Sequence, residues 1–250
     1  MKRLLIAATL LFIALACRDA GSFRTGNARA GLPLRDTTGP FAQRGEPAGS
    51  VPAGKIKTGD LLFVGIPADY SIDESDMDGA ISASTGSGGL NLIHTAILEV
   101  ERDTVWVIDA TIKYGVDRHP IDTMFKQFTL KDGSQPAYII KRLKHSRHAS
   151  KYVENAKAFL GRPYDVAFLP DNEAMYCTEL VRESYRKADG AYLFGNKPMN
   201  FRNAEGEFPL YWQQLFALIG QEIPQGLPGT NPQDMSAEPV LRTVSTNLLK

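Results

Sequence analysis

The sequence predicts an α+β fold in which an antiparallel sheet packs against helices. Short runs of β-branched and aromatic residues fill the first half of the chain beyond residue 54. Segments with the 3.6-residue period of amphipathic helices fill the second half. Residues 55–250 have the length of one ordinary domain and contain no internal repeat. We therefore expect one folded domain over these residues.

Four segments have the composition of strands and end at glycine, proline or charged residues, namely 60–65, 93–100, 104–110 and 137–143. Only the short polar link Glu101-Arg102-Asp103 separates the second strand from the third. Those two strands are expected to form a hairpin, which would set their side chains next to each other. Four strands in succession favour an antiparallel sheet.

Three later segments have a helical period, namely 150–160, 177–188 and 209–219. The first ends at residues 161–163, where glycine and proline stop a helix. The second begins at Cys177, which shares a face with the apolar residues of that segment. Cys177 is thus expected in the first turn of a helix, facing the body of the protein. Residues 221–240, rich in proline and glycine, are expected to wrap the surface.

The first 17 residues have the features of a signal peptide. Lys2 and Arg3 precede an apolar run over 4–15 that is too short to span a bilayer. The run ends in Ala14-Leu15-Ala16-Cys17, which resembles a bacterial lipobox, whose cysteine is acylated and becomes the new N-terminus. Ordinary cleavage after the same residues is the alternative. Lipidation at Cys17 would make the protein an envelope lipoprotein, secreted across the inner membrane and held on a membrane surface.

Residues 18–54 are rich in Gly, Pro, Ala, Arg and Asp and have few large apolar side chains. This composition predicts a flexible tether with a reach of roughly 30 to 35 Å. The whole chain has 28 basic and 28 acidic residues, so loss of the leader with Lys2 and Arg3 leaves a net charge of −2. With no basic stripe, nucleic acid is excluded as an expected partner.

Cys177 is the one cysteine that remains beyond the leader, since the chain has only two. A lone thiol in an oxidising compartment has no disulfide partner, so it is either a buried small hydrophobic residue or a nucleophile. Its place at a helix N-terminus favours the nucleophile, because free backbone N–H groups and the helix dipole stabilise a thiolate. The same N–H groups can hold an oxyanion.

A nucleophilic thiol needs a base, and the chain has four histidines. His145 and His148 lie in a basic run, and His119 precedes a proline at an expected turn. His94 differs, because it lies inside an apolar strand after a flexible stretch. It is the candidate base, although a strand histidine with a single structural hydrogen bond is the alternative.

Asp109 lies in the expected strand over 104–110 and is the only charged residue between positions 105 and 111, an unfavourable place for a carboxylate without a partner. The predicted hairpin would bring it within reach of His94, where it could orient the imidazole and stabilise its protonated form. A structural role, capping a turn or pairing with Lys113 or Arg118, is the alternative.

Five sequence features, taken in order, resemble the permuted papain-fold cysteine hydrolases of the NlpC superfamily, the YiiX/YebB-like group. They are GDLLF at 59–63, the strand beginning at His94, VIDA at 107–110, GRPYD at 161–165 and YCTELV at 176–181. The resemblance runs from about residue 59 to 239. It implies a circularly permuted papain-like fold with an antiparallel sheet or small barrel, in which the base histidine precedes the nucleophile.

Carried over to this chain, the resemblance implies that Cys177 is the nucleophile, His94 the general base and Asp109 the third residue. The family is expected to have glutamate most often at the third position, so the shorter Asp109 is a departure. Tyr164 matches a tyrosine beside the nucleophile whose hydroxyl can assist the oxyanion hole. Glu179 matches an acidic position that either contacts a substrate amine or complements the helix N-terminus.

These residues predict acyl transfer through a thioester, with no metal or cofactor. The resemblance implies amide bonds of cell-wall peptides as substrates, and acyl groups on lipids as an alternative. Residues 66–91, acidic and then small, are expected to form either a specificity lid for a cationic amine or a solvated loop. A tethered, non-catalytic module that binds wall peptide or lipid is the competing hypothesis.

Overall fold

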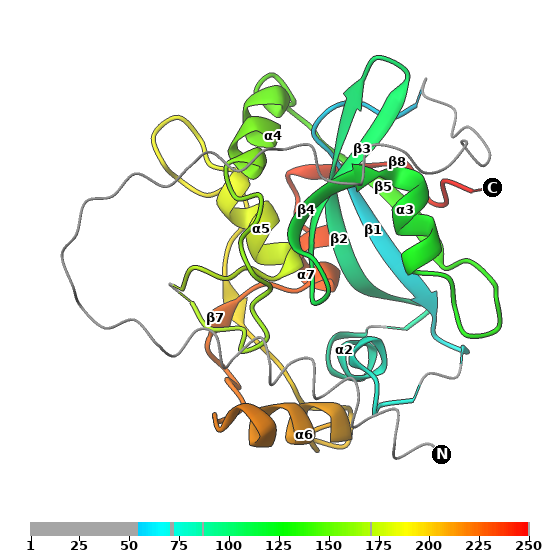
Figure 1. The fold of residues 1–250 in the computed structure, drawn as a ribbon, viewed down its shortest axis with the longest axis vertical. Coiled ribbons are helices and arrows are strands. Elements are labelled where there is room, and N and C mark those ends of the chain that lie inside the picture. Colours follow the sequence, from blue (N-terminus) through cyan, green and yellow to red (C-terminus); the bar gives the residue numbers. More distant parts are fainter. Residues whose placement is uncertain (1–54, 71–72, 87, 171, 250) are drawn as a thin grey trace, which may run out of the picture.

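The computed structural model describes residues 55–70, 73–86, 88–170 and 172–249. The predicted signal peptide over 1–17, with Cys17, and the predicted tether over 18–54 lie outside the described residues. The described chain is built around a six-stranded antiparallel sheet with the strand order β4-β3-β2-β1-β5-β8. Helices cover both faces of this sheet (Figure 1).

The strands of the sheet are β1 (Asp60–Pro67), β2 (Leu90–Glu101), β3 (Thr104–Thr111), β4 (Gly115–Pro120), β5 (Ala137–Leu143) and β8 (Leu241–Ser245). All four predicted strands are confirmed, as β1, β2, β3 and β5. The predicted hairpin is confirmed as well, because Glu101 pairs with Thr104 across the turn between β2 and β3. The edge strands β4 and β8 were not predicted.

The helices are α2 (Met77–Thr85), α3 (Ile121–Gln127), α4 (Ala149–Lys157), α5 (Cys177–Ser184), α6 (Leu210–Ile219) and α7 (Pro232–Ser236). A separate two-stranded sheet pairs β6 (Lys197–Pro198) with β7 (Pro228–Gly229). The three predicted helices correspond to α4, α5 and α6. The expected extent of the second was wrong, because α5 ends at Ser184 and Tyr185 leaves the helical conformation. Part of the 66–91 segment, expected as a loop or lid, forms α2.

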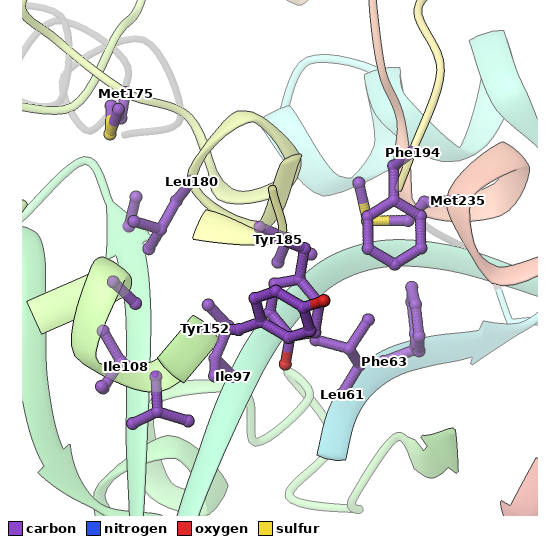
Figure 2. Close-up of a cluster of buried hydrophobic side chains, with 14 of the residues drawn as sticks. Leu61, Phe63, Ile97, Ile108, Tyr152, Met175, Leu180, Tyr185, Phe194 and Met235 are labelled. Carbon is purple, nitrogen blue, oxygen red and sulfur yellow. The ribbon is translucent and has the colours of Figure 1, made fainter. Parts of the chain in front are cut away.

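The alternation of side chains along β1 produces two cores, one on each face of the sheet. Leu61 and Phe63 point into the cluster beneath α4 and α5, where Tyr152, Leu180 and Tyr185 also lie (Figure 2). Leu62, between them, points to the opposite face, which α3 covers. Each such fully buried side chain contributes about 1.5–3 kcal/mol of burial free energy. The sheet is therefore fixed from both sides.

Several contacts fix the first turn of α5, which carries Cys177. The hydroxyl of Thr178 donates a 3.0 Å hydrogen bond to the carbonyl oxygen of Thr230. The backbone N–H of Thr230 in turn donates to the hydroxyl of Tyr176 at 3.2 Å. Farther along, Tyr185 donates from its hydroxyl to the carbonyl oxygen of Gly59 at 3.0 Å. The N-terminus of α5 is thereby tied to the segment between β7 and α7, and its C-terminal end to the residue before β1.

Candidate active site

Cys177 is the first residue of α5 and is 7% exposed. At this position its backbone N–H has no acceptor within the helix, so it is free to bind an anion. The thiol lies next to the imidazole ring of His94, and both side chains line the same cavity. The predicted nucleophile and the predicted base are thus neighbours, and Cys177 is not enclosed by apolar side chains alone.

A β-bulge next to His94 helps aim its side chain. Val64 of β1 pairs with His94 of β2, but the next residue, Gly65, pairs with Leu92. Ile93 is therefore an extra residue in β2, and such bulges change the direction of neighbouring side chains. The ring of Phe128 lies 4.7 Å from the His94 ring, centroid to centroid, and covers one side of it.

Asp109 contacts the same imidazole ring, with His94 Nε2 2.7 Å from Asp109 Oδ2. The pairing of Ile97 with Ile108 fixes the β2–β3 register. When this register is extended by one pair of residues, Asp109 lies diagonally across from His94 on the same face of the sheet. Arg118, a possible partner at the sequence level, instead binds Glu99 at 2.8 Å. The structure brings Cys177, His94 and Asp109 together in that order.

A second histidine, His119, reaches the same carboxylate, with its Nε2 3.2 Å from Asp109 Oδ1. It lies on β4, opposite Val107, which is two residues from Asp109 on β3. Sequence reasoning placed His119 at a turn and missed this contact. If residues 115–120 had been recognised as a strand that forms a hairpin with β3, the contact between His119 and Asp109 could have been predicted.

The charges of these groups support one another. Burial raises the pKa of Asp109, but hydrogen bonds from His119 and His94 lower it more, to about 2. Burial lowers the pKa of His94, but the negative charge on Cys177 and the hydrogen bond to Asp109 raise it well above its ordinary range. His94 is therefore poised to hold a proton between a sulfur atom and a carboxylate.

Tyr164 lies beside Cys177, as the resemblance implied. A parallel bridge between Tyr164 and Met175 ties its segment to the residues before α5. On the other side, Gly115 lets β4 approach this segment closely, since a Cβ there would lie 2.2 Å from the carbonyl oxygen of Arg162. Burial, followed by the nearby charge of Cys177, raises the pKa of the Tyr164 hydroxyl. The hydroxyl is thus a neutral hydrogen-bond donor at the site.

Glu179 lies in the first turn of α5 but lines neither of the two cavities that border Cys177. The nearby backbone of Tyr176 lowers the pKa of its carboxyl, as expected for a glutamate in the capping-box position of a helix, and its Oε2 is buried with no hydrogen-bond partner among the described residues. Burial, and then repulsion from Asp165, raise the pKa of Glu179 to about 8. Of its two expected roles, this geometry favours the one at the helix terminus over contact with a substrate.

Two cavities meet at Cys177. The larger, of about 650 Å³, is lined by His94, Tyr164 and Cys177 together with Asp78 of α2 and Lys113 of the β3–β4 turn. The smaller, of about 60 Å³, lies on the other side of Cys177 and has an aromatic lining of Tyr164, Phe168, Tyr176, Phe201 and Trp212. A substrate with its reacting carbonyl at Cys177 would therefore extend into a wide cavity on one side and a narrow apolar one on the other.

Asp78 was not singled out by the sequence. It is solvent-exposed within the larger cavity. The surrounding protein reduces the hydration of its carboxylate and so raises the pKa of Asp78. The positive charge on His94 lowers that pKa in part. Its neighbour Asp76 forms an ion pair with Lys131 across the cavity rim, whereas the carboxylate of Asp78 has no hydrogen-bond partner in the described part of the chain.

Within the described ranges, no three His, Cys, Asp or Glu side chains are placed so that they could share a metal ion. Nor does any helix in this part of the chain combine the length and apolar character required to cross a membrane.

Comparison with known proteins places these features in a family. A curated relative, the uncharacterized protein YiiX of Escherichia coli K12, is 26% identical over 203 residues, which are 78% of this chain and 90% of YiiX. A crystal structure described as that of the metalloprotein YiiX from Escherichia coli O157:H7 has 25% sequence identity and a TM-score of 0.59. It covers 77% of this chain and 98% of its own. The family described as permuted papain-like amidase enzymes, YaeF/YiiX, C92, matches residues 55–245, so the chain belongs to this family and has its papain-like α+β fold.

Proposed function

We propose that this amidase is cysteine-dependent, with Cys177 as nucleophile, His94 as general base and Asp109 as the residue that orients His94. The observation that carries the proposal is the position of the His94 ring, which lies next to the thiol of Cys177 and contacts the carboxylate of Asp109 at the wall of a cavity. A complete set of this kind favours turnover over mere binding of a ligand.

In the proposed reaction, the proton of the Cys177 thiol passes to His94, and the sulfur attacks the carbonyl carbon of an amide. The backbone N–H of Cys177 and the hydroxyl of Tyr164 donate hydrogen bonds to the resulting oxyanion. His94 then gives its proton to the leaving nitrogen, the C–N bond breaks, and a thioester remains on Cys177. Water, deprotonated by His94, hydrolyses the thioester and releases the acid. The YiiX crystal structure is described as that of a metalloprotein. The described residues of this chain include no set of three His, Cys, Asp or Glu side chains that could hold a metal ion, and the proposed reaction has no metal-dependent step.

We propose a cell-wall peptide as substrate, on the basis of the two cavities. The free carboxylate of Asp78 in the larger cavity suits a substrate ammonium group near the reacting amide. The smaller cavity, about 60 Å³, has room for only a few methyl-sized groups. It suits the short side chain of an alanine-like residue better than the long acyl chain of a lipid.

To test amine recognition, KM is measured for wall-type peptides with a free amine and for the N-acetylated form of each peptide. Asp78→Asn is expected to raise KM for the amine peptide by about tenfold or more, because a hydrogen-bonded charge pair is lost, and to change KM for the acetylated peptide little. Asp76→Asn is the matched control, since Asp76 is already paired with Lys131. Equal effects of Asp78→Asn on both peptides would contradict amine recognition, and turnover of acyl lipids in place of peptides would favour the lipid alternative.

We also propose that the protein is a lipoprotein of the cell envelope, anchored through Cys17. The support is the lipobox-like sequence at residues 14–17. Cys17→Ala is expected to release the protein from membrane fractions or to block its maturation, as measured by fractionation and immunoblotting. Unchanged membrane association of the variant would refute the lipid anchor.

A further inference from the structure

The carboxylate of Asp109 is 1% exposed and is shared by two imidazole rings. Its Oδ2 faces Nε2 of His94 at 2.7 Å, and its Oδ1 faces Nε2 of His119 at 3.2 Å. A buried carboxylate oxygen without a donor is costly, so each histidine satisfies one oxygen. The orientation of the carboxylate therefore depends on His119 as well as on His94.

The ring of His119 lies between two acceptors. Its Nδ1 is 3.1 Å from the carbonyl oxygen of Pro120, and its Nε2 is 3.2 Å from Asp109. A neutral imidazole has only one N–H, so both acceptors are satisfied only when the ring is protonated on both nitrogens. Burial lowers the pKa of His119, but the hydrogen bond to Asp109 and the charges of Asp109 and Asp117 raise it overall.

The four groups alternate in charge when Cys177 is ionised as the nucleophile. The thiolate, the imidazolium of His94, the carboxylate of Asp109 and the imidazolium of His119 then sum to zero. Without a donor at Oδ1 the buried carboxylate would keep one unsatisfied oxygen, and Asp109 would gain by taking a proton or by turning away. Either change would weaken its hold on His94, and through His94 it would reduce the reactivity of the thiol.

We propose that His119 is a positioning residue of this site, which keeps Asp109 ionised and aimed at His94. His119 lines neither cavity, so it acts without contact with the substrate. The inference rests on the proposed function, since His119 reaches Cys177 only through Asp109 and His94.

Two neutral amide variants of the full-length protein separate the two contacts of the ring. The side-chain nitrogen of glutamine in His119→Gln takes the place of Nε2 and keeps a donor to Asp109. The nitrogen of asparagine in His119→Asn takes the place of Nδ1 and keeps only the donor to Pro120. The readout is the rate at which iodoacetamide alkylates Cys177 between pH 4 and pH 9, and thermal melting checks the fold.

At pH 6 His119→Asn is expected to be alkylated about tenfold more slowly than the wild type, with its pH profile displaced upward by about two units. His119→Gln should remain within about threefold of the wild-type rate. The control His145→Asn, at an exposed histidine, should have no effect. Equal rates for the Asn and Gln variants, or a greater loss with Gln, would overturn the role of His119. A wild-type thiol no more reactive than free cysteine would instead overturn the proposed function, and this inference with it.

Discussion

Replacement of Cys177 by alanine is expected to abolish amide hydrolysis, with a loss in kcat of at least about 10⁴-fold. The thiol supplies the bond-forming atom, and the oxyanion donors and the binding cavities alone leave only residual catalysis. The fold should survive, because the change removes a single sulfur atom and alanine is the best helix former. Single-turnover measurements on a wall-type peptide, with circular dichroism as a check of the fold, give the comparison.

Cys177→Ser is the matched control, because it keeps a hydroxyl in the same place. A hydroxyl is far less acidic than a thiol, so the serine variant should bind substrate normally and turn over almost none. Retention of wild-type turnover by the alanine variant would mean that the reaction does not proceed through Cys177.

Asp109→Asn is expected to have the second-largest effect, a loss in kcat of about 10²-fold or more. The carboxylate raises the pKa of His94, so its replacement by a neutral amide lowers that pKa and leaves less imidazolium to pair with a thiolate near pH 7. The alkylation of Cys177 by iodoacetamide at pH 6 should slow in parallel. The loss in turnover should remain smaller than that of Cys177→Ala, since the nucleophile is still present.

Asp109→Glu is the companion variant, and it should retain much of the activity because the family resemblance implies that the longer acid is tolerated at this position. Full activity and a wild-type alkylation rate in Asp109→Asn would assign Asp109 a structural role only. The third role would then belong to another polar group or to water.

The contact between His94 and Asp109 could be predicted from the sequence because it is local. Only residues 101–103 separate the two predicted strands, so the hairpin and its register follow from a short polar turn. The helix that begins at Cys177 could be predicted for a similar reason, since its apolar residues recur with a helical period. Both the helical period and the turn depend only on residues that are close to one another in the sequence.

The residues that were missed depend on partners far away in the chain. The β4 sequence GVDRHP has polar side chains at half of its positions and ends in proline. It becomes a strand only by pairing with β3, so His119 was assigned to a turn. The α2 sequence MDGAISAST is rich in small residues and has a weak helical pattern. Its Ala80 becomes buried in the cluster formed with α6, which places Asp78 at the cavity. Such tertiary contacts override local propensity.

The most direct test of the account is the rate of Cys177 alkylation in the unmodified, folded protein as a function of pH. With the thiol paired to His94, iodoacetamide should label Cys177 at pH 6 far faster than it labels free cysteine, as peptide mass spectrometry would show. The rate should change little between pH 6 and pH 8. Labelling that appears only after unfolding, or that rises only near the ordinary thiol pKa of about 8.5, would contradict a cysteine nucleophile at this site.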